Sequence, residues 1–433
     1  MIKIYDTMTR SLRDFVPLTE NVVNMYVCGP TVYNYIHIGN ARSAVAFDTI
    51  RRYFEYCGYT VNYISNFTDV DDKIIKAANE AGISTKELSD KFIAAFMEDT
   101  AQLGIKPATQ NPRVINYMDE IIAFVSTLVD KGFAYVSEGD VYFRVAKSNN
   151  YAKLANKTLE DLEIGASGRT DAETERKENP LDFALWKAAK EGEVSWDSPW
   201  GPGRPGWHIE CSVMATEILG DTIDIHGGGA DLEFPHHTNE IAQSEAKTGK
   251  TFANYWMHNG FVNVDNEKMS KSLGNFVTVH DMLKTVDGQV LRFFLATQQY
   301  RKPINFTEKA IHDAEVNLKY LKNTHSLPLT DQVNQDELQT YLEAFQEAMD
   351  DDFNTANGVT VLFDMAKWIN SGNYDQTVKD AFEKMLQVFG IVFEEEVLDA
   401  DIEKLIEERQ AARANKDFAT ADRIRDELAA QGI

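Results

Sequence analysis

The apolar positions in the first 65 residues follow two different periods. Val22–Val27 is an apolar, β-branched run that ends in a Cys-Gly-Pro segment, which predicts a strand entering a loop. Apolar residues then recur at helical spacing over residues 41–56, and a glycine ends this helix. Tyr59–Ile64 alternates and predicts a second strand. Strand, helix and strand in this order predict a parallel sheet, with its ligand edge at the turn between the first strand and the helix.

After residue 65 the pattern of apolar, polar, glycine and proline residues changes three times. Residues 74–132 show a mainly helical pattern, and residues 133–206 are broken by glycine and proline, as expected of an insertion between two halves of a sheet. Strand-like patterns return at residues 222–226 and 256–264, and from about residue 310 the pattern is helical, polar and acidic. We therefore predict an α/β protein with an inserted segment, followed by an all-α module.

The charge and the cysteine content narrow the class of protein. The formal net charge of -25 argues against binding of polyanions through bulk charge, although a local basic face can still bind nucleic acid. Three cysteines are too few for a disulfide framework, and the first residues lack the apolar region of a signal peptide. Because no apolar run is long enough to span a bilayer, we expect a soluble protein of a reducing, intracellular compartment.

The segment His37-Ile38-Gly39-Asn40 lies at the predicted start of the first helix. The free N–H groups and the dipole of a helix N-terminus suit phosphate, and a glycine lets the backbone approach a ligand closely. The imidazole of His37 can donate to a phosphate oxygen. Alone, a four-residue string is weak evidence, and Asn40 by itself is more typical of a helix cap than of a catalytic group.

A second candidate is the polar loop Lys268–Asn275, in which Lys268 and Lys271 bracket small hydroxyl residues. Mobile ammonium groups can neutralise the charge that develops on a triphosphate in the transition state. An isolated pair of lysines, however, is more often an ordinary exposed basic loop.

Four residues far apart in the sequence are candidates for a metal site. Cys28 ends the first strand, Cys211 follows the insertion, and His236 and Glu240 have the i, i+4 spacing that places them on one face of a helix. Two thiolates, an imidazole and a carboxylate make a tetrahedral zinc set. The residue types alone leave the alternative open, because a single cysteine or histidine is usually a packed or hydrogen-bonded core residue. We interpret the third cysteine, Cys57, as a buried thiol at a helix end.

Together these segments resemble a known enzyme family. His37–Asn40 resembles the first signature of the class I aminoacyl-tRNA synthetases, with asparagine in place of the usual last histidine, and Lys268–Ser272 matches the second. They occur in the family's order on either side of a large insertion. Longer strings over nearly the whole chain are similar to those of the cysteinyl-tRNA synthetases: Tyr26–Tyr33, Phe67–Lys73, Asn179–Lys187, Gly206–Ser212, His226–Glu240 and Met349–Ala356.

This resemblance implies an ATP-dependent ligation of L-cysteine to tRNA(Cys) through a cysteinyl-adenylate, with Mg²⁺ bound to ATP. It also implies one Zn²⁺ per chain, held by Cys28, Cys211, His236 and Glu240. Zinc bound by thiolates is borderline soft and prefers a thiolate to an alcohol. A plain pocket distinguishes cysteine from serine poorly, so the metal would select the substrate without an editing domain.

The resemblance also implies roles for other residues. His37, Gly39 and Asn40 would bind ATP, with Lys271 as the main phosphate lysine and Lys268 as a secondary one. No protein nucleophile is required, so catalysis should rest on positioning and charge stabilisation. The residues expected to contact cysteine or its adenylate are Thr68, Trp207 and Asp231. The carboxylates expected to cap a helix or be solvated, rather than bind metal, are Asp69, Asp71 and Asp72.

The implied organisation has five segments. Residues 1–132 and 207–262 would form the two halves of a Rossmann-like catalytic domain, and residues 133–206 the connective insertion. Residues 263–312 would link this domain, through the Lys268–Ser272 loop, to a helical domain of residues 313–433 that binds the anticodon arm. Family members usually continue beyond the position of Ile433 into a small anticodon-reading piece, so we expect a shortened helical domain. We expect a cytoplasmic monomer with no membrane partner.

Two alternatives stay open. A related ligase that joins cysteine to an amino sugar in mycothiol synthesis shares the zinc and lysine motifs, but the helical C-terminal region with Met349–Ala356 favours the tRNA enzyme. The other alternative is a non-catalytic relative that binds tRNA or a nucleotide. The presence of all three groups of candidate residues speaks against it.

Overall fold

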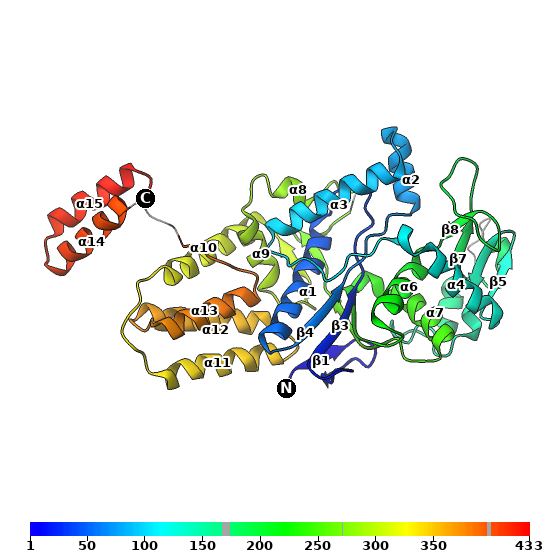
Figure 1. The fold of residues 1–433 in the computed structure, drawn as a ribbon, viewed down its shortest axis with the longest axis horizontal. Coiled ribbons are helices and arrows are strands. Elements are labelled where there is room, and N and C mark those ends of the chain that lie inside the picture. Colours follow the sequence, from blue (N-terminus) through cyan, green and yellow to red (C-terminus); the bar gives the residue numbers. More distant parts are fainter. Residues whose placement is uncertain (167–173, 271, 396–399) are drawn as a thin grey trace. The chain divides into compact units, whose positions relative to one another are not determined.

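The computed structural model describes residues 1–166, 174–270, 272–395 and 400–433, which form two compact units, Met1–Ile391 and Val392–Ile433. The first unit is built on a four-stranded sheet in the order β10-β9-β3-β4, in which each pair of neighbours is parallel; Figure 1 labels β3 and β4. This confirms the predicted α/β fold. The four strands are Ala253–Asn259 (β10), Ile223–Gly229 (β9), Val22–Val27 (β3) and Thr60–Ile64 (β4).

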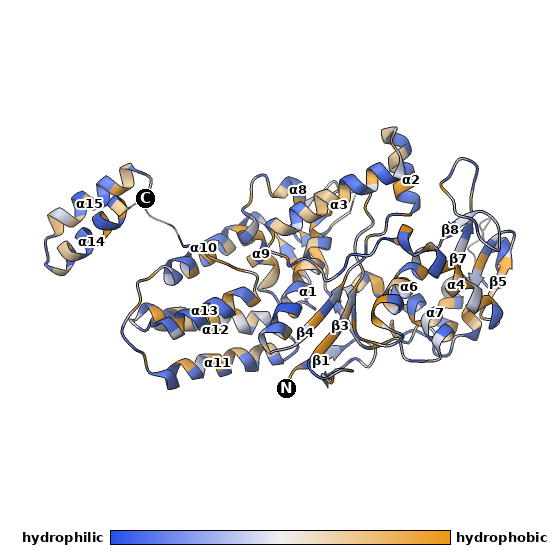
Figure 2. Ribbon diagram, in the orientation of Figure 1, coloured by the Kyte–Doolittle hydropathy of each residue, from blue (hydrophilic) through white to orange (hydrophobic). Residues whose placement is uncertain are grey.

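The strands of this sheet are buried because helices cover it. Val23 and Met25 of β3 and Ile225 of β9 are fully buried, and Figure 2 shows apolar colours in parts of β3 and β4. Helix α1 (Ile38–Tyr56) connects β3 to β4 and buries its apolar face. The helix predicted at residues 41–56 therefore begins three residues earlier than expected. Cys57 lies at the end of α1 as predicted, but it is exposed, because it follows the last buried turn of the helix.

The insertion between the two halves of the parallel sheet carries its own antiparallel sheet, in the order β5-β6-β7-β8. Its core side chain Trp186 is fully buried, and one continuous apolar cluster joins it to Tyr26 of β3. The strands and the helices around them are Ala134–Ser137 (β5), Asp140–Phe143 (β6), Phe183–Ala188 (β7), Gly203–Pro205 (β8), Met118–Asp130 (α4), Leu159–Ala166 (α5), Trp207–Leu219 (α6) and Thr238–Thr248 (α7).

The C-terminal part of the first unit is helical, as predicted, and its helices bury apolar side chains such as Phe345, Leu362 and Phe382. The helices are Gly288–Ala296 (α9), Glu308–His325 (α10), Gln335–Asp350 (α11), Thr355–Asn370 (α12) and Gln376–Val388 (α13). The remaining elements are Lys3–Asp6 (β1), Ser11–Asp14 (β2), Val262–Val264 (β11), Glu267–Lys268 (β12), Ile304–Phe306 (β13), Asp72–Ala81 (α2), Thr85–Gln102 (α3) and Val279–Met282 (α8).

A buried ion pair joins α1, the first helix of the parallel-sheet region, to the helical C-terminal part. Arg292 of α9 donates from Nη1 to Oδ2 of Asp48 in α1 at 2.7 Å, and both side chains are at most 3% exposed. Its Nε donates to the carbonyl oxygen of Phe389, just after α13, at 2.9 Å, and its Nη2 to the hydroxyl of Thr49 at 3.0 Å. The side chain of Arg292 therefore links α1 to the end of α13 through one buried set of hydrogen bonds.

The second unit contains the helices Ala400–Ala414 (α14) and Phe418–Ala430 (α15), which pack against each other. Its buried side chains are Ala412, Ala421, Ile424 and Leu428. Within the described part of both units, every helix is too short or too polar to cross a bilayer.

Candidate active site

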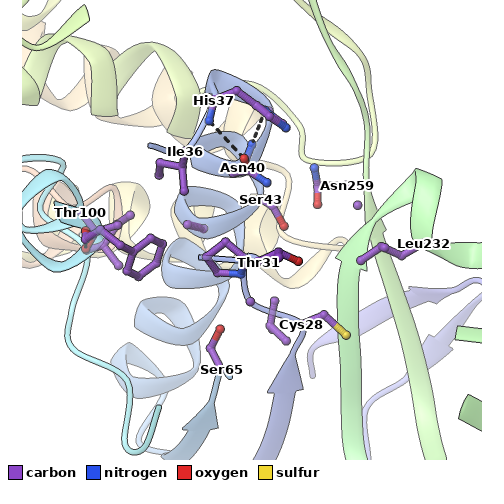
Figure 3. Close-up of a pocket in the computed structure, with 18 of the residues that line it drawn as sticks. Cys28, Thr31, Ile36, His37, Asn40, Ser43, Ser65, Thr100, Leu232 and Asn259 are labelled. Atoms are coloured by element: carbon purple, nitrogen blue, oxygen red, sulfur yellow. Dashed lines mark hydrogen bonds between the residues drawn. The ribbon is translucent and has the colours of Figure 1, made fainter. Parts of the chain in front are cut away.

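The first turn of α1 forms one wall of a cavity of about 650 Å³, shown in Figure 3. His37 is the N-cap: its Nδ1 accepts the backbone N–H of Asn40 at 3.2 Å, and Asn40 Oδ1 accepts the backbone N–H of His37 at 3.1 Å. The cap predicted for Asn40 is therefore shared between the two residues. A Cβ on Gly39 would lie 2.8 Å from Cε1 of His37, so glycine is what lets the imidazole fold back over the helix start.

Another part of the cavity wall comes from the segment that follows β9, from the end of β10 and from β12. Asp231 and Asn259 line it, and so does Lys268, whose Nζ lies 5.9 Å from the ring centroid of Phe261. The structure therefore brings Lys268 to the same cavity as His37. Lys271 lies outside the described residues, so its role stays a prediction.

Cys28 joins this cavity to a buried group of metal-ligand side chains. Its Sγ lies 3.5 Å from Sγ of Cys211 and 3.5 Å from Nε2 of His236, and His236 Nε2 lies 3.3 Å from Oε2 of Glu240. All four ligand atoms lie within 4.8 Å of one another. A tetrahedral zinc with ordinary bond lengths has sulfur–nitrogen edges of about 3.6 Å and nitrogen–oxygen edges of about 3.3 Å. The spacing of the four predicted ligands therefore fits zinc.

Local structure explains how these distant residues meet. Cys28 follows the last residue of β3, and Cys211 lies in the first turns of α6. His236 and Glu240 lie one helical turn apart, across the junction between the irregular turn η5 (Glu233–His237) and α7. Since β3 and β9 pair in parallel, the carboxyl ends of both halves of the sheet converge on this point.

The pKa shifts of these side chains indicate that a cation would stabilise their ligand forms. Burial, together with the neighbouring Cys211, raises the pKa of the Cys28 thiol well above its ordinary value. Burial likewise raises the pKa of Glu240 and lowers the pKa of His236 well below its ordinary value. Each shift disfavours the charged form. A divalent cation reverses this balance by stabilising thiolates and a carboxylate, so the donor set matches a thiophilic metal.

Two further histidines, which sequence reasoning missed, form a second group with Cys28 and Glu240. His237 Nε2 lies 3.5 Å from Cys28 Sγ, and His226 Nε2 lies 2.9 Å from Glu240 Oε1. The only sequence signal was the His-His pair at residues 236 and 237. We favour the set with Cys211 because it offers two sulfur donors. In that set His226 hydrogen-bonds the outer oxygen of Glu240, and such contacts orient metal ligands.

The three predicted substrate residues differ in position. The exposed ring of Trp207 stacks on His236, with centroids 4.1 Å apart, and both Trp207 and Asp231 line the cavity. Thr68 is buried, and its hydroxyl accepts from the amide of Asn66 at 3.2 Å. The structure thus brings two of the three to the cavity surface, whereas Thr68 is buried and does not line the cavity.

Comparison with known proteins identifies the family. Residues 14–316 match the tRNA synthetases class I (C) catalytic domain, residues 344–394 the DALR domain, and residues 395–433 the cysteinyl-tRNA ligase anticodon binding domain. Over all 433 residues the chain is 95% identical to the cysteine–tRNA ligase of Streptococcus thermophilus (strain CNRZ 1066) and 82% identical to that of Streptococcus agalactiae serotype III (strain NEM316), covering 97% of each relative. The chain belongs to the cysteine–tRNA ligase family. This confirms the resemblance and makes the protein an aminoacyl-tRNA ligase.

The structure of methionyl-tRNA synthetase from Mycobacterium tuberculosis, in complex with methionyl-adenylate, is similar in fold. It aligns with a TM-score of 0.62 and 15% identity, over 85% of this chain and 89% of that chain. At this identity the likeness concerns the fold alone. The match to the anticodon binding domain covers residues 395–433. From the sequence, these residues were predicted to belong to a single helical domain of residues 313–433.

Proposed function

We propose that this ligase activates L-cysteine with ATP and transfers the cysteinyl group to tRNA(Cys). In the first step a carboxylate oxygen of cysteine attacks the α-phosphorus of ATP, with Mg²⁺ on the phosphates, and pyrophosphate leaves. In the second step a hydroxyl of the tRNA's terminal ribose attacks the acyl carbon, and AMP leaves. One observation carries the proposal: a single cavity is lined both by the start of α1, which suits phosphate, and by Cys28 of the metal-ligand group.

The residues around the cavity have different roles in the first step. His37, Gly39 and Asn40 hold the phosphates of ATP against the helix start, and Lys268 with Lys271 neutralises the charge that develops on the leaving pyrophosphate. Because Nδ1 of His37 is engaged in the cap, we expect its Nε2 to face the phosphates. No side chain has to form a covalent intermediate, so the rate depends on how well these groups hold both substrates in line.

Zinc selection of the substrate is the second part of the proposal. The residues that would hold Zn²⁺ are Cys28, Cys211, His236 and Glu240. When bound, the metal supplies a Lewis acid that takes the substrate as a thiolate and so disfavours serine. Trp207 stacks on one ligand and faces the cavity, where it closes one side of the cysteine pocket. Asp231, also at the cavity, would bind the amino group of the substrate, and we keep Thr68 as a support beneath it.

The acceptor follows from the C-terminal part. The matches to the DALR and anticodon-binding families over residues 344–433 support tRNA, rather than an amino sugar, as the acceptor. The predicted boundaries of the five segments and the cytoplasmic, monomeric state stay predictions.

The test is ATP–pyrophosphate exchange with a panel of amino acids, before and after removal of zinc. We expect exchange with cysteine and none with serine, loss of exchange on chelation, and recovery when zinc is returned. Charging of tRNA(Cys) then identifies the acceptor. If folded, zinc-loaded protein gives no exchange with cysteine, the proposal is wrong.

A further inference from the structure

One ammonium group at the cavity has no part in the function proposed so far. Lys73 lies in the first turn of α2 and lines the same cavity as His37 and Cys28. Its Nζ lies 5.5 Å from the ring centroid of Tyr33, in the loop between β3 and α1. The face of the aromatic ring attracts the ammonium group, and this contact leaves the positive charge of Lys73 without a counter-charge.

The carboxylates nearest to Lys73 in sequence bind groups other than its ammonium group. Asp69 accepts from Nε of Arg113 at 2.9 Å and from the backbone N–H of Ile115 at 3.2 Å. Asp71 caps α2, as predicted, by accepting the backbone N–H of Lys73 at 2.8 Å, whereas the prediction was wrong for Asp69, which is buried and paired with Arg113. Asp72 forms an ion pair with the buried guanidinium of Arg204. Within the described part of the chain, the ammonium group of Lys73 therefore has no carboxylate partner.

The backbone that presents Lys73 is firmly held. Phe67 donates its backbone N–H to the carbonyl oxygen of Pro112 at 2.9 Å, and Thr68 donates its own to the carbonyl oxygen of Pro30 at 3.1 Å. Asn66 accepts the backbone N–H of Gly29 at 3.0 Å. The segment before α2 is thus tied to the loop that carries Cys28, and the lysine starts from a fixed point at the edge of the cavity.

The position of α2 indicates which anion the ammonium group of Lys73 binds. The triphosphate of ATP is assigned to the start of α1 and to the loop after β12. Lys73 comes from another helix, and the Asp72–Arg204 ion pair ties that helix to β8, three residues before Trp207. The start of α2 is therefore tied to the segment that leads to Trp207, whereas Lys268 comes from β12, although both lysines line the cavity. A tRNA end that brings its ribose to the acyl carbon must bring its last phosphodiester into the cavity mouth as well.

We propose that Lys73 binds the phosphodiester of the 3′-terminal nucleotide of tRNA and positions the accepting ribose for the transfer step. A lysine suits this task because its compact charge holds a phosphate without fixing a single geometry. The inference rests on the proposed function, since it assigns a residue to the second of the two steps.

The test compares two partial reactions in the full-length, zinc-loaded protein. ATP–pyrophosphate exchange with cysteine reports the first step without tRNA. Single-turnover transfer from preformed adenylate to a tRNA(Cys) transcript reports the second. For Lys73→Met we expect the ratio of transfer to exchange to fall roughly tenfold to hundredfold, the usual effect of losing a hydrogen bond to a charged group. Lys73→Arg should recover most of this loss, because it keeps the charge.

Lys76→Met is the matched control. Lys76 lies one turn further along α2, its side chain is 79% exposed, and its nearest acidic partner is Glu80 at 4.0 Å. We expect this variant to keep the wild-type ratio. If Lys73→Met lowers exchange as much as transfer, the lysine serves ATP and the inference fails. It also fails if neither reaction changes. Absence of exchange in the wild-type protein would instead refute the proposed function, so the two failures are distinct.

Discussion

Replacing Arg292 by methionine tests how strongly the buried ion pair holds the first unit together. The variant loses the bonds to Asp48, to Thr49 and to the carbonyl oxygen of Phe389. Breaking a buried pair from one side typically costs about 3–5 kcal/mol, because a buried charge is left without its partner. Asp48 keeps a second guanidinium, Nε of Arg52 at 2.8 Å, so we expect the lower end, about 3 kcal/mol.

Urea unfolding followed by tryptophan fluorescence measures this loss. All 6 tryptophans lie within Met1–Ile391, so their fluorescence reports the first unit without contribution from the second. A matched control is Lys309→Met, which breaks the pair with Asp313 whose side chains are 85% and 54% exposed. Exposed pairs contribute about 0.5 kcal/mol or less. If Arg292→Met costs less than about 1 kcal/mol, the argument from burial is refuted.

Three further predictions concern the metal group, the ATP wall and acid stability. Cys211→Ala should lower the zinc content well below one per chain in native mass spectrometry, whereas Cys57→Ser should not; equal zinc in both variants would contradict the ligand assignment. Gly39→Ala should raise the KM for ATP in the exchange assay several-fold, because the new Cβ would lie 2.8 Å from Cε1 of His37; an unaltered KM argues against a tight cap at this site. Burial acts to raise the pKa of Asp48, but its guanidinium neighbours outweigh this and hold the pKa below its usual value. Its ionised form therefore stabilises the fold above about pH 4, and this stabilisation is lost as the pH falls through the lowered pKa. The urea midpoint of the wild type should fall more steeply below that pH than the midpoint of Asp48→Asn, and parallel curves would count against this linkage.

The parts that sequence predicted well are those that depend on local periodicity. The strand at Val22–Val27 and the helix that became α1 were visible in the pattern of apolar residues, and the i, i+4 spacing of His236 and Glu240 held across the junction into α7. The same reasoning placed Cys28 at the end of β3, which is where a parallel sheet collects its ligand-binding residues.

The parts that it missed depend on contacts between distant segments. His237 reaches Cys28 at the same 3.5 Å as His236, and no spacing rule separates the two. Arg42 is fully buried, and its guanidinium donates to the carbonyl oxygens of Lys302 at 2.9 Å and Gln299 at 3.0 Å. A buried arginine that binds backbone carbonyls has no signature in sequence, because its partners are not side chains. The exposure of Cys57 likewise follows from where α1 leaves the core.

The pairing of β3 with β9 has a consequence for synthesis on the ribosome. Cys28 is made early, but its partners among the ligands, Cys211 to Glu240, emerge only after the insertion has been translated. At about 5–20 residues per second, the nascent chain waits roughly ten to forty seconds between the first ligand and the last. During that interval one edge of β3 has no neighbouring strand, and open edges invite association with other chains. If the four residues hold zinc as proposed, the site is complete only after Glu240 has been made, and until then the open edge of β3 is a surface that chaperones would protect.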